Sequence, residues 1–107
     1  MTNFHIRKAT PEDAQTIYDL IYKLAVYEKL ENEVVTTPDE LREQIFEKKY
    51  AEVIIAEEDE KPVGFALYFH NFSTFVGKPG IYLEDLFVEP ETRGKGYGKA
   101  LLVELAR

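Results

Sequence analysis

The stretch Tyr82–Leu102, YLEDLFVEPETRGKGYGKALL, decides the fold of this 107-residue chain. Apolar residues typical of a strand lead into a turn at Pro90, and the glycine-rich run Arg93–Lys99 leads directly into residues that favour a helix. Glycines let the backbone turn tightly. The first N–H groups of a helix lack partners within it, and the helix dipole is positive at that end. The stretch therefore predicts a site that binds a phosphate or pyrophosphate through backbone N–H groups.

Familiar nucleotide loops fit this stretch poorly. A Walker loop needs Ser or Thr after its lysine to bind magnesium, but Lys99 is followed by Ala100, which counts against a nucleotide-binding fragment. A dinucleotide fingerprint needs the spacing Gly-x-Gly-x-x-Gly, whereas these glycines are evenly spaced at Gly94, Gly96 and Gly98. A turn that only caps the helix is the simplest alternative. Three glycines are unfavourable for that purpose, since each costs up to about 1 kcal/mol in a helical setting.

The composition bounds the domain count and the partners. The 107 residues, 45% of them hydrophobic, make one domain, 1–107. A net charge of −7 argues against nucleic acid and is compatible with a cationic substrate. The chain has no cysteine, so disulfides and thiolate nucleophiles are excluded. It has no apolar run of about twenty residues and no signal-peptide pattern at its N-terminus, so we expect no membrane partner and a cytoplasmic location.

Hydrophobic spacing and helix-start signals predict the element order β-α-α-β-β-β-α. The runs Thr10–Asp13 and Thr37–Glu40 each place a capping threonine before Pro and acidic residues, which is typical of a helix start. The predicted strands are 4–9, 51–57, 63–69 and 81–88, and the predicted helices run from 11 to about 30, from 38 through 46, and from 96–98 onward. Residues 70–80 are expected to form an aromatic-rich loop, and Leu101, Leu102 and Leu105 to point inward.

Two adjacent acids, Glu84 and Asp85, lie in the last predicted strand. Side chains of neighbouring strand residues point to opposite faces unless a bulge intervenes, so the two carboxylates need not share one site. The chain has two histidines, His5 and His70, and neither has a neighbour at metal-ligand spacing, so we expect no metal site.

The run Val88-x-Pro-x-x-Arg93-Gly-x-Gly-x-Gly98 resembles the acetyl-CoA motif of the GNAT superfamily of N-acetyltransferases. The segments Phe4–Thr10, Leu24–Glu28, Val63–Tyr68 and Tyr82–Asp85 resemble the diamine (spermidine/spermine) acetyltransferase branch. The resemblance implies an α/β (α+β) fold with a mixed, largely antiparallel sheet flanked by helices. In that family a further strand, helix and strand follow, so we expect this chain to be the N-terminal part of a longer enzyme.

The resemblance also implies how acetyl-CoA, the co-substrate, is held. Backbone N–H groups of six consecutive residues would contact the pyrophosphate: Gly94, Lys95, Gly96, Tyr97, Gly98 and Lys99. The main chain of Leu86, Phe87 and Val88 would pair with the pantetheine arm as if it were another strand. Arg93 would bind phosphate, or else pair with Glu89 or Glu91; the sequence favours neither alternative.

By the same resemblance Glu84 is the general base, acting through water, for an amine whose free pKa is about 10. Tyr27, Glu28 and Asp85 would line the amine site with it. The alternatives are a strand-edge acid paired with a lysine and a helix end whose tyrosine rests on the core. With no cysteine available to carry an acetyl group, direct transfer in a ternary complex is favoured. The usual proton donor of the family, a tyrosine, is expected beyond residue 107.

The predicted activity is N-acetylation of a small-molecule primary amine, and the resemblance implies a homodimer. The polyamine enzymes carry an acid and a tryptophan where this chain has Ser73 and Phe75, so a thialysine-like amine is as plausible as a polyamine. The alternative from another class is a catalytically silent module that binds CoA or dimerises.

Overall fold

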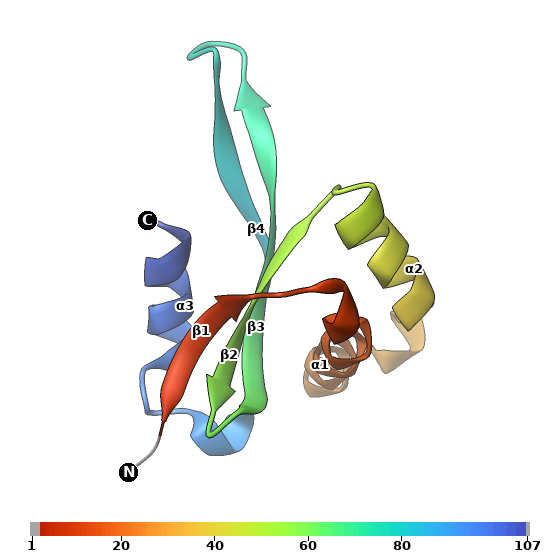
Figure 1. The fold of residues 1–107 in the computed structure, drawn as a ribbon, viewed down its shortest axis with the longest axis vertical. Helices are drawn as coiled ribbons and strands as arrows, with labels where there is room; N and C mark the ends of the chain where they lie inside the picture. The colour runs from red at the N-terminus through yellow and green to blue at the C-terminus, as the bar shows by residue number, and fades with distance from the viewer. Residues whose placement is uncertain (1–2, 107) are drawn as a thin grey trace.

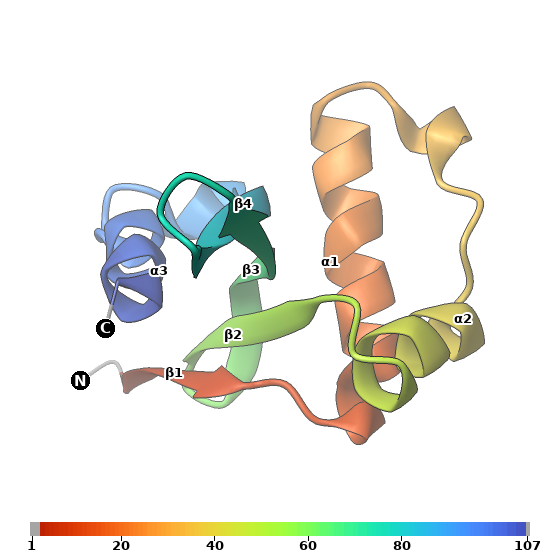
Figure 2. The same ribbon diagram turned by 90° about the horizontal axis from the view of Figure 1, so that it is seen from above.

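The computed structural model describes residues 3–106 as a four-stranded sheet with helices on both faces (Figures 1 and 2). Its main elements are β1 (Phe4–Lys8), α1 (Ala14–Tyr27), α2 (Pro38–Arg42), β2 (Glu52–Glu58), β3 (Lys61–Ser73), β4 (Lys78–Val88) and α3 (Tyr97–Leu105). Short helical turns are η1 (Pro11–Asp13), η2 (Glu31–Glu33), η3 (Glu43–Glu47) and η4 (Pro90–Thr92). The predicted order β-α-α-β-β-β-α is confirmed.

The strands lie in the order β1-β2-β3-β4, and each neighbouring pair is antiparallel. Helices α1 and α2 cover one face of the sheet and α3 covers the other, as Figure 2 shows. Because both faces are covered, the central strand β2 is apolar on both sides. This explains the continuous run Val53–Ala56, in which all four residues are buried.

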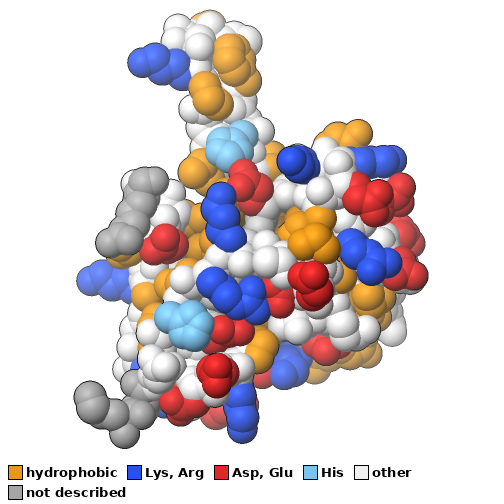
Figure 3. Space-filling view, viewed as in Figure 1, with side chains coloured by type: hydrophobic (Ala, Val, Ile, Leu, Met, Phe, Trp, Pro, Cys, Tyr) orange, Lys and Arg blue, Asp and Glu red, His pale blue; other side chains and the backbone are white. Residues whose placement is uncertain are grey.

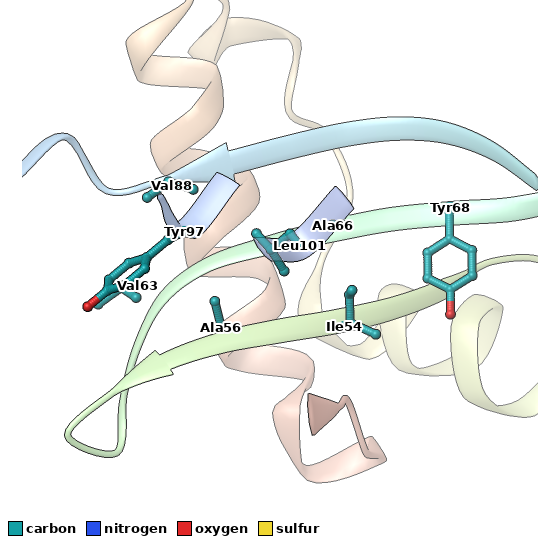
Figure 4. Close-up of a cluster of buried hydrophobic side chains, with 8 residues drawn as sticks. All are labelled: Ile54, Ala56, Val63, Ala66, Tyr68, Val88, Tyr97 and Leu101. Atoms are coloured by element: carbon teal, nitrogen blue, oxygen red, sulfur yellow. The ribbon is translucent and has the colours of Figure 1, made fainter. Parts of the chain in front are cut away.

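Two hydrophobic clusters fill the two faces. The cluster under α3, drawn in Figure 4, contains Ile54, Ala56, Val63, Ala66, Tyr68, Val88, Tyr97 and Leu101. The cluster under α1 contains Ile17, Leu20, Ile45, Val53, Ile55, Phe65 and Phe87. Of the leucines expected to point inward from α3, Leu101 is fully buried and Leu105 packs on the cluster. The expectation is wrong for Leu102, which is 45% exposed.

The prediction of a loop over residues 70–80 is wrong. Strands β3 and β4 continue pairing through Ser73 and Lys78, so only 74–77 form the turn, with Gly77 at φ 74°. The strands extend because cross-strand pairing, which includes the stacked rings of Phe69 and Tyr82, outweighs the local preference of glycine and proline for a turn. The resulting hairpin projects from the body of the molecule (Figures 1 and 3).

Both predicted N-terminal helices exist, with different limits. The first ends at Tyr27 rather than near Leu30, because Lys29 adopts a positive φ of 61° that no helix continues through. The second begins as predicted, since the Thr37 hydroxyl accepts a 3.1 Å hydrogen bond from the backbone N–H of Glu40. After Arg42 it widens into the π-helical turn η3.

A polar network fastens β1 to the start of the first helix. The Arg7 guanidinium donates two hydrogen bonds to Asp13, of 2.7 and 2.8 Å, and a third of 3.1 Å to Glu57. The backbone N–H of Thr10 also donates to the Asp13 carboxylate, at 2.7 Å. These bonds lower the pKa of Asp13 to about 2, with the bond from Arg7 as the main cause.

Candidate active site

The glycine loop between η4 and α3 has the backbone geometry that the sequence predicted. Gly94 and Gly96 have φ values of 91° and 81°, in the region that glycine adopts without strain. Gly96 is the N-cap of α3, and no side chain hydrogen-bonds to the cap, so the amides of the first turn have no side-chain acceptor there. A Cβ added at either glycine would meet nothing within 4 Å. The loop therefore faces open space and leaves room for an anion.

A hollow of about 460 Å³ lies between this loop and the end of β4. It is lined by Leu86, Val88, Arg93, Gly94, Gly96, Tyr97 and Gly98, all of which the sequence predicted for acetyl-CoA. Three others from that prediction, Phe87, Lys95 and Lys99, do not line it. Open amides, glycines and an arginine beside one hollow fit the diphosphate of a CoA molecule.

The side chains of Lys95 and Tyr97 both reach one carboxylate, that of Glu58. Lys95 Nζ donates a 2.8 Å hydrogen bond to Glu58 Oε2, and the Tyr97 hydroxyl donates to the same oxygen. The Lys95 hydrogen bond is also the main cause of the lowered pKa of Glu58. The predicted strand 51–57 stops one residue before Glu58, and no local pattern could have linked Glu58 to partners 37 and 39 positions away.

Arg93 contacts helix α1 instead of either acid proposed from the sequence. Its Nη1 donates a 2.9 Å hydrogen bond to the Tyr27 hydroxyl, and its Nε donates to the Val88 carbonyl at 3.3 Å. Among the described residues Arg93 forms an ion pair with neither Glu89 nor Glu91, and the Glu89 carboxylate instead accepts a 2.6 Å hydrogen bond from Lys23. Its pairing with phosphate stays a prediction.

A second hollow, of about 410 Å³, lies between α1 and the end of β4. It is lined by Lys23, Val26, Tyr27, Phe87, Glu89, Pro90 and Glu91. Tyr27 is 57% exposed, so the alternative in which its ring rests on the core is wrong. Arg93 lines the first hollow and Tyr27 lines the second, so their hydrogen bond connects the two hollows across the end of β4.

The adjacent acids lie at a bulge in β4, the exception that the sequence analysis allowed for. Asp85 pairs with Leu67 and Leu83 with Tyr68, so Glu84 is an extra residue without a partner across the strand pair. Leu67 packs in the cluster under α1, which places Asp85 on that face of the sheet. Glu84 is exposed and Asp85 half-buried.

The structure brings Glu28, from the end of α1, to the same acidic site. Burial raises the pKa of Asp85, and the negative charges of Glu84 and Glu28 raise it further. A carboxylate with a raised pKa is a stronger proton acceptor than an ordinary one, which suits a general base. Glu28, Glu84 and Asp85 thus lie close enough for their charges to interact, and they form one acidic cluster at the bulge of β4.

The described residues 3–106 contain no group of three or more His, Asp or Glu side chains that could hold a metal ion. Over the same range, none of the helices is both long and apolar enough to cross a bilayer.

Comparison with known proteins identifies the family. Residues 14–107 match the Acetyltransferase (GNAT) family. The chain belongs to this family. GNAT enzymes use acetyl-CoA. The predicted fold class and the predicted class of enzyme, an acetyltransferase, are confirmed.

Curated GNAT relatives cover the whole chain. Thialysine N-epsilon-acetyltransferase of Caenorhabditis elegans is 38% identical over 100% of this chain and 68% of its own length. Spermidine/spermine N(1)-acetyltransferase-like protein 1 of Homo sapiens is 33% identical over 100% of this chain and 16% of its own length. Both names agree with the diamine acetyltransferase branch, and the silent-module alternative is not favoured. The chain spans about two thirds of the length of the thialysine enzymes, between 64% and 68%.

Solved structures confirm the fold. A crystal structure from Clostridium acetobutylicum, described as a predicted acetyltransferase with acetyl-CoA, matches with a TM-score of 0.77 and 22% identity. The match covers 99% of this chain and 71% of that one.

Proposed function

We propose that this GNAT protein transfers the acetyl group of acetyl-CoA to a primary amine of a small molecule. The observation that carries the proposal is the open glycine loop at the N-terminus of α3, which shares a hollow with the end of β4. An acidic cluster at the bulge of the same strand supports it. One strand end would thus serve both substrates.

Main-chain groups would bind acetyl-CoA. The amides of Gly94 to Lys99 would donate to the diphosphate, which adds to the favourable end of the helix dipole. Strand β4 is at an edge of the four-stranded sheet, so no strand among residues 3–106 pairs with its outer side. Leu86, Phe87 and Val88 could therefore offer backbone groups there to the amides of the pantetheine arm.

The acidic cluster would attract the amine and accept its proton. Glu84 is exposed at the bulge, where water can relay a proton to its carboxylate. Asp85, whose pKa is raised by burial, and Glu28 would attract the cationic amine to the same place. Tyr27 would border the amine site with its exposed ring. The nitrogen, once neutral, would attack the thioester carbon directly, since the chain has no cysteine to carry an acetyl group.

A diamine, a polyamine or a thialysine-like amine is the substrate class that we propose. Several acids near one amine site suit a substrate with more than one positive charge, and the net charge of −7 favours its approach. The relatives named for thialysine and for spermidine or spermine support the same class. Ser73 and Phe75, which stand where the polyamine enzymes carry an acid and a tryptophan, lie at the hairpin tip. Phe75 is fully exposed there, and Ser73 has no negative charge with which to attract a polyamine.

The test is acetylation of a panel of diamines, polyamines and thialysine, measured as release of free CoA thiol, with calorimetry of CoA binding alongside. We expect turnover with at least one member of the panel and none with a neutral amide analogue. Binding of CoA without any acetyl transfer would instead support the silent module. Failure to bind CoA would overturn both proposals.

We also propose that the protein is a homodimer that meets its second copy at the β3–β4 hairpin. The hairpin exposes large apolar side chains, namely Phe72, Phe75, Val76, Ile81 and Tyr82 (Figure 3). Residues 69–82 contain Lys78 and no acid, so this is a surface where two copies of a chain with charge −7 can approach without acid-to-acid repulsion. Light scattering should give twice the chain mass, and Phe75→Asp should give the monomer. A monomeric wild-type protein would contradict this proposal.

A further inference from the structure

We propose that Glu58 is a positioning residue for the glycine loop: through Lys95 and Tyr97 it holds the loop amides in the arrangement that binds the diphosphate of acetyl-CoA. The inference rests on the proposed function and deepens it. Glu58 lies at the end of β2, behind the loop and outside the residues that line the hollow.

The backbone of Glu58 is a fixed point. It pairs with Phe4 of β1 on one side and with Lys61 of β3 on the other. Its side chain is only 16% exposed. A carboxylate on a central strand, held from both sides, can serve as an anchor for a neighbouring segment that has little rigidity of its own.

The glycine loop is such a segment. Glycine loses more backbone entropy on ordering than any other residue. Lys95 is the single residue between Gly94 and Gly96, both of which have positive φ values. Its Nζ lies 2.8 Å from Glu58 Oε2, so the side chain that separates the two glycines is bonded to the sheet.

The second tether fixes the start of α3. The Tyr97 hydroxyl donates to the same Glu58 oxygen, and the Tyr97 ring stacks on Phe4 with centroids 3.9 Å apart and planes 11° apart. Tyr97 is only 8% exposed. Because Tyr97 is the first residue of α3, this contact also fixes the direction in which the first-turn amides point.

The pairing also decides how Lys95 can act. Its ammonium group is neutralised by Glu58, so Lys95 contributes to the loop through its backbone position. If the Glu58 charge acted on the diphosphate only through space, it would repel it, and removing that charge would tighten CoA binding. A positioning role predicts the opposite sign, which makes the two effects separable.

The experiment compares Glu58→Gln with the wild-type protein by calorimetry of CoA binding and by steady-state kinetics. We expect the Kd for CoA and the KM for acetyl-CoA to rise about tenfold, the loss typical of one charge-assisted hydrogen bond, with the KM for the amine little changed. An unchanged or lower Kd for CoA overturns the inference. An equal rise in both KM values also overturns it, since general damage to the fold would raise both.

Glu52→Gln is the matched control. Glu52 begins β2, as Glu58 ends it, and its carboxylate likewise has two side-chain partners, Lys8 at 3.8 Å and His70 at 3.2 Å. It does not contact the glycine loop, so the Kd for CoA should stay at the wild-type value. A tenfold rise in this control as well would assign the effect to general damage from losing a carboxylate on β2 and overturn the inference.

Two partner variants keep the inference testable if Glu58→Gln does not fold. Lys95→Met and Tyr97→Phe each remove one tether and keep the side-chain bulk, and Tyr97→Phe also keeps the stack on Phe4. Each should raise the Kd for CoA by about three- to tenfold. Wild-type values in both would overturn the inference alone, whereas a wild-type protein that does not bind CoA would overturn the proposed function first.

Discussion

The guanidinium carbon of Arg93 lies 4.4 Å from the centre of the Tyr27 ring, while Arg93 Nη1 donates a 2.9 Å hydrogen bond to the Tyr27 hydroxyl. The two residues are 66 positions apart, and the contact joins the glycine loop to the end of α1. A residue predicted to meet acetyl-CoA thus touches one predicted to meet the amine. Any movement of Arg93 toward a diphosphate would release Tyr27, so the two substrates should influence each other's binding.

We predict that Tyr27→Phe changes acetyl-CoA binding as well as amine binding. The substitution removes the hydroxyl acceptor of Arg93 and keeps the ring beneath its guanidinium, so the KM for acetyl-CoA should change by about threefold, as for one exposed hydrogen bond. Tyr22→Phe is the control, because Tyr22 lies on the same helix and is 42% exposed, with no contact to the loop. Steady-state kinetics with each substrate varied in turn would check this. A change confined to the KM for the amine would contradict the link.

We predict that Gly96→Ala destabilises the protein by about 1 kcal/mol and weakens CoA binding. A Cβ at this position meets no neighbouring atom, so the cost comes from the φ of 81°, which other residues adopt with strain. Gly98→Ala is the comparison for stability. It lies inside α3, where its Cβ would make an ordinary 3.8 Å contact with Val88, so this change should stabilise the helix by about 0.5–1 kcal/mol. Urea unfolding should give a lower free energy of unfolding for Gly96→Ala and a higher one for Gly98→Ala than for the wild-type protein. Equal changes in the two variants would contradict this account.

The parts of the fold that the sequence predicted well depend on local pattern. The apolar run within 51–57 predicted strand β2, and the glycine run predicted where α3 begins, because hydrophobic pattern and backbone freedom are properties of neighbouring residues. The same holds for the Thr37 cap.

The parts that could not be predicted depend on distant pairing. The bulge at Glu84 arises from the register between β3 and β4, which no residue near Glu84 specifies. The contacts of Glu58 with the loop and of Arg93 with Tyr27 bring together residues 37 to 66 positions apart. The sequence predicts a loop at the hairpin tip because glycine and proline favour a loop locally, whereas pairing of the two strands outweighs that preference.

We predict that the stability of the protein falls between about pH 4 and pH 2 because of Asp13. Its folded-state pKa of about 2 lies below the usual 3.8, with the hydrogen bond from Arg7 as the main cause. The contribution is complete above pH 3.8 and is lost as the pH falls through about 2. Asp13→Asn should cost about 2 kcal/mol at neutral pH and flatten this part of the curve. Asp19→Asn, at an exposed acid with a single 2.9 Å bond from Gln15, should leave the curve unchanged. The measurement is urea unfolding across pH, and an unchanged curve for Asp13→Asn would rule out this origin.

We predict that the two adjacent acids of the cluster affect different kinetic constants, Glu84 the kcat and Asp85 the KM for the amine. If Glu84 accepts the amine proton, Glu84→Gln should lower kcat by about 100-fold, the usual contribution of a general base. Asp85→Asn should act mainly on the KM for the amine, because a half-buried carboxylate beside the site attracts the cation without receiving its proton. Initial rates at saturating acetyl-CoA would separate the two. A larger fall in kcat for Asp85→Asn would assign the base to Asp85 instead.

The pH dependence of the same variants identifies the base independently. A carboxylate base works only when ionised, so kcat/KM falls as the pH drops through its pKa. The pKa of Asp85 is raised by burial first, and then by the charges of Glu84 and Glu28. If Asp85 were the base, Glu28→Gln would remove one of those charges and move the acid limb of the profile to lower pH. An acid limb of kcat/KM that stays in place in Glu28→Gln would exclude Asp85 as the base. The presence or absence of that single shift therefore tests one of two carboxylates that are adjacent in the sequence.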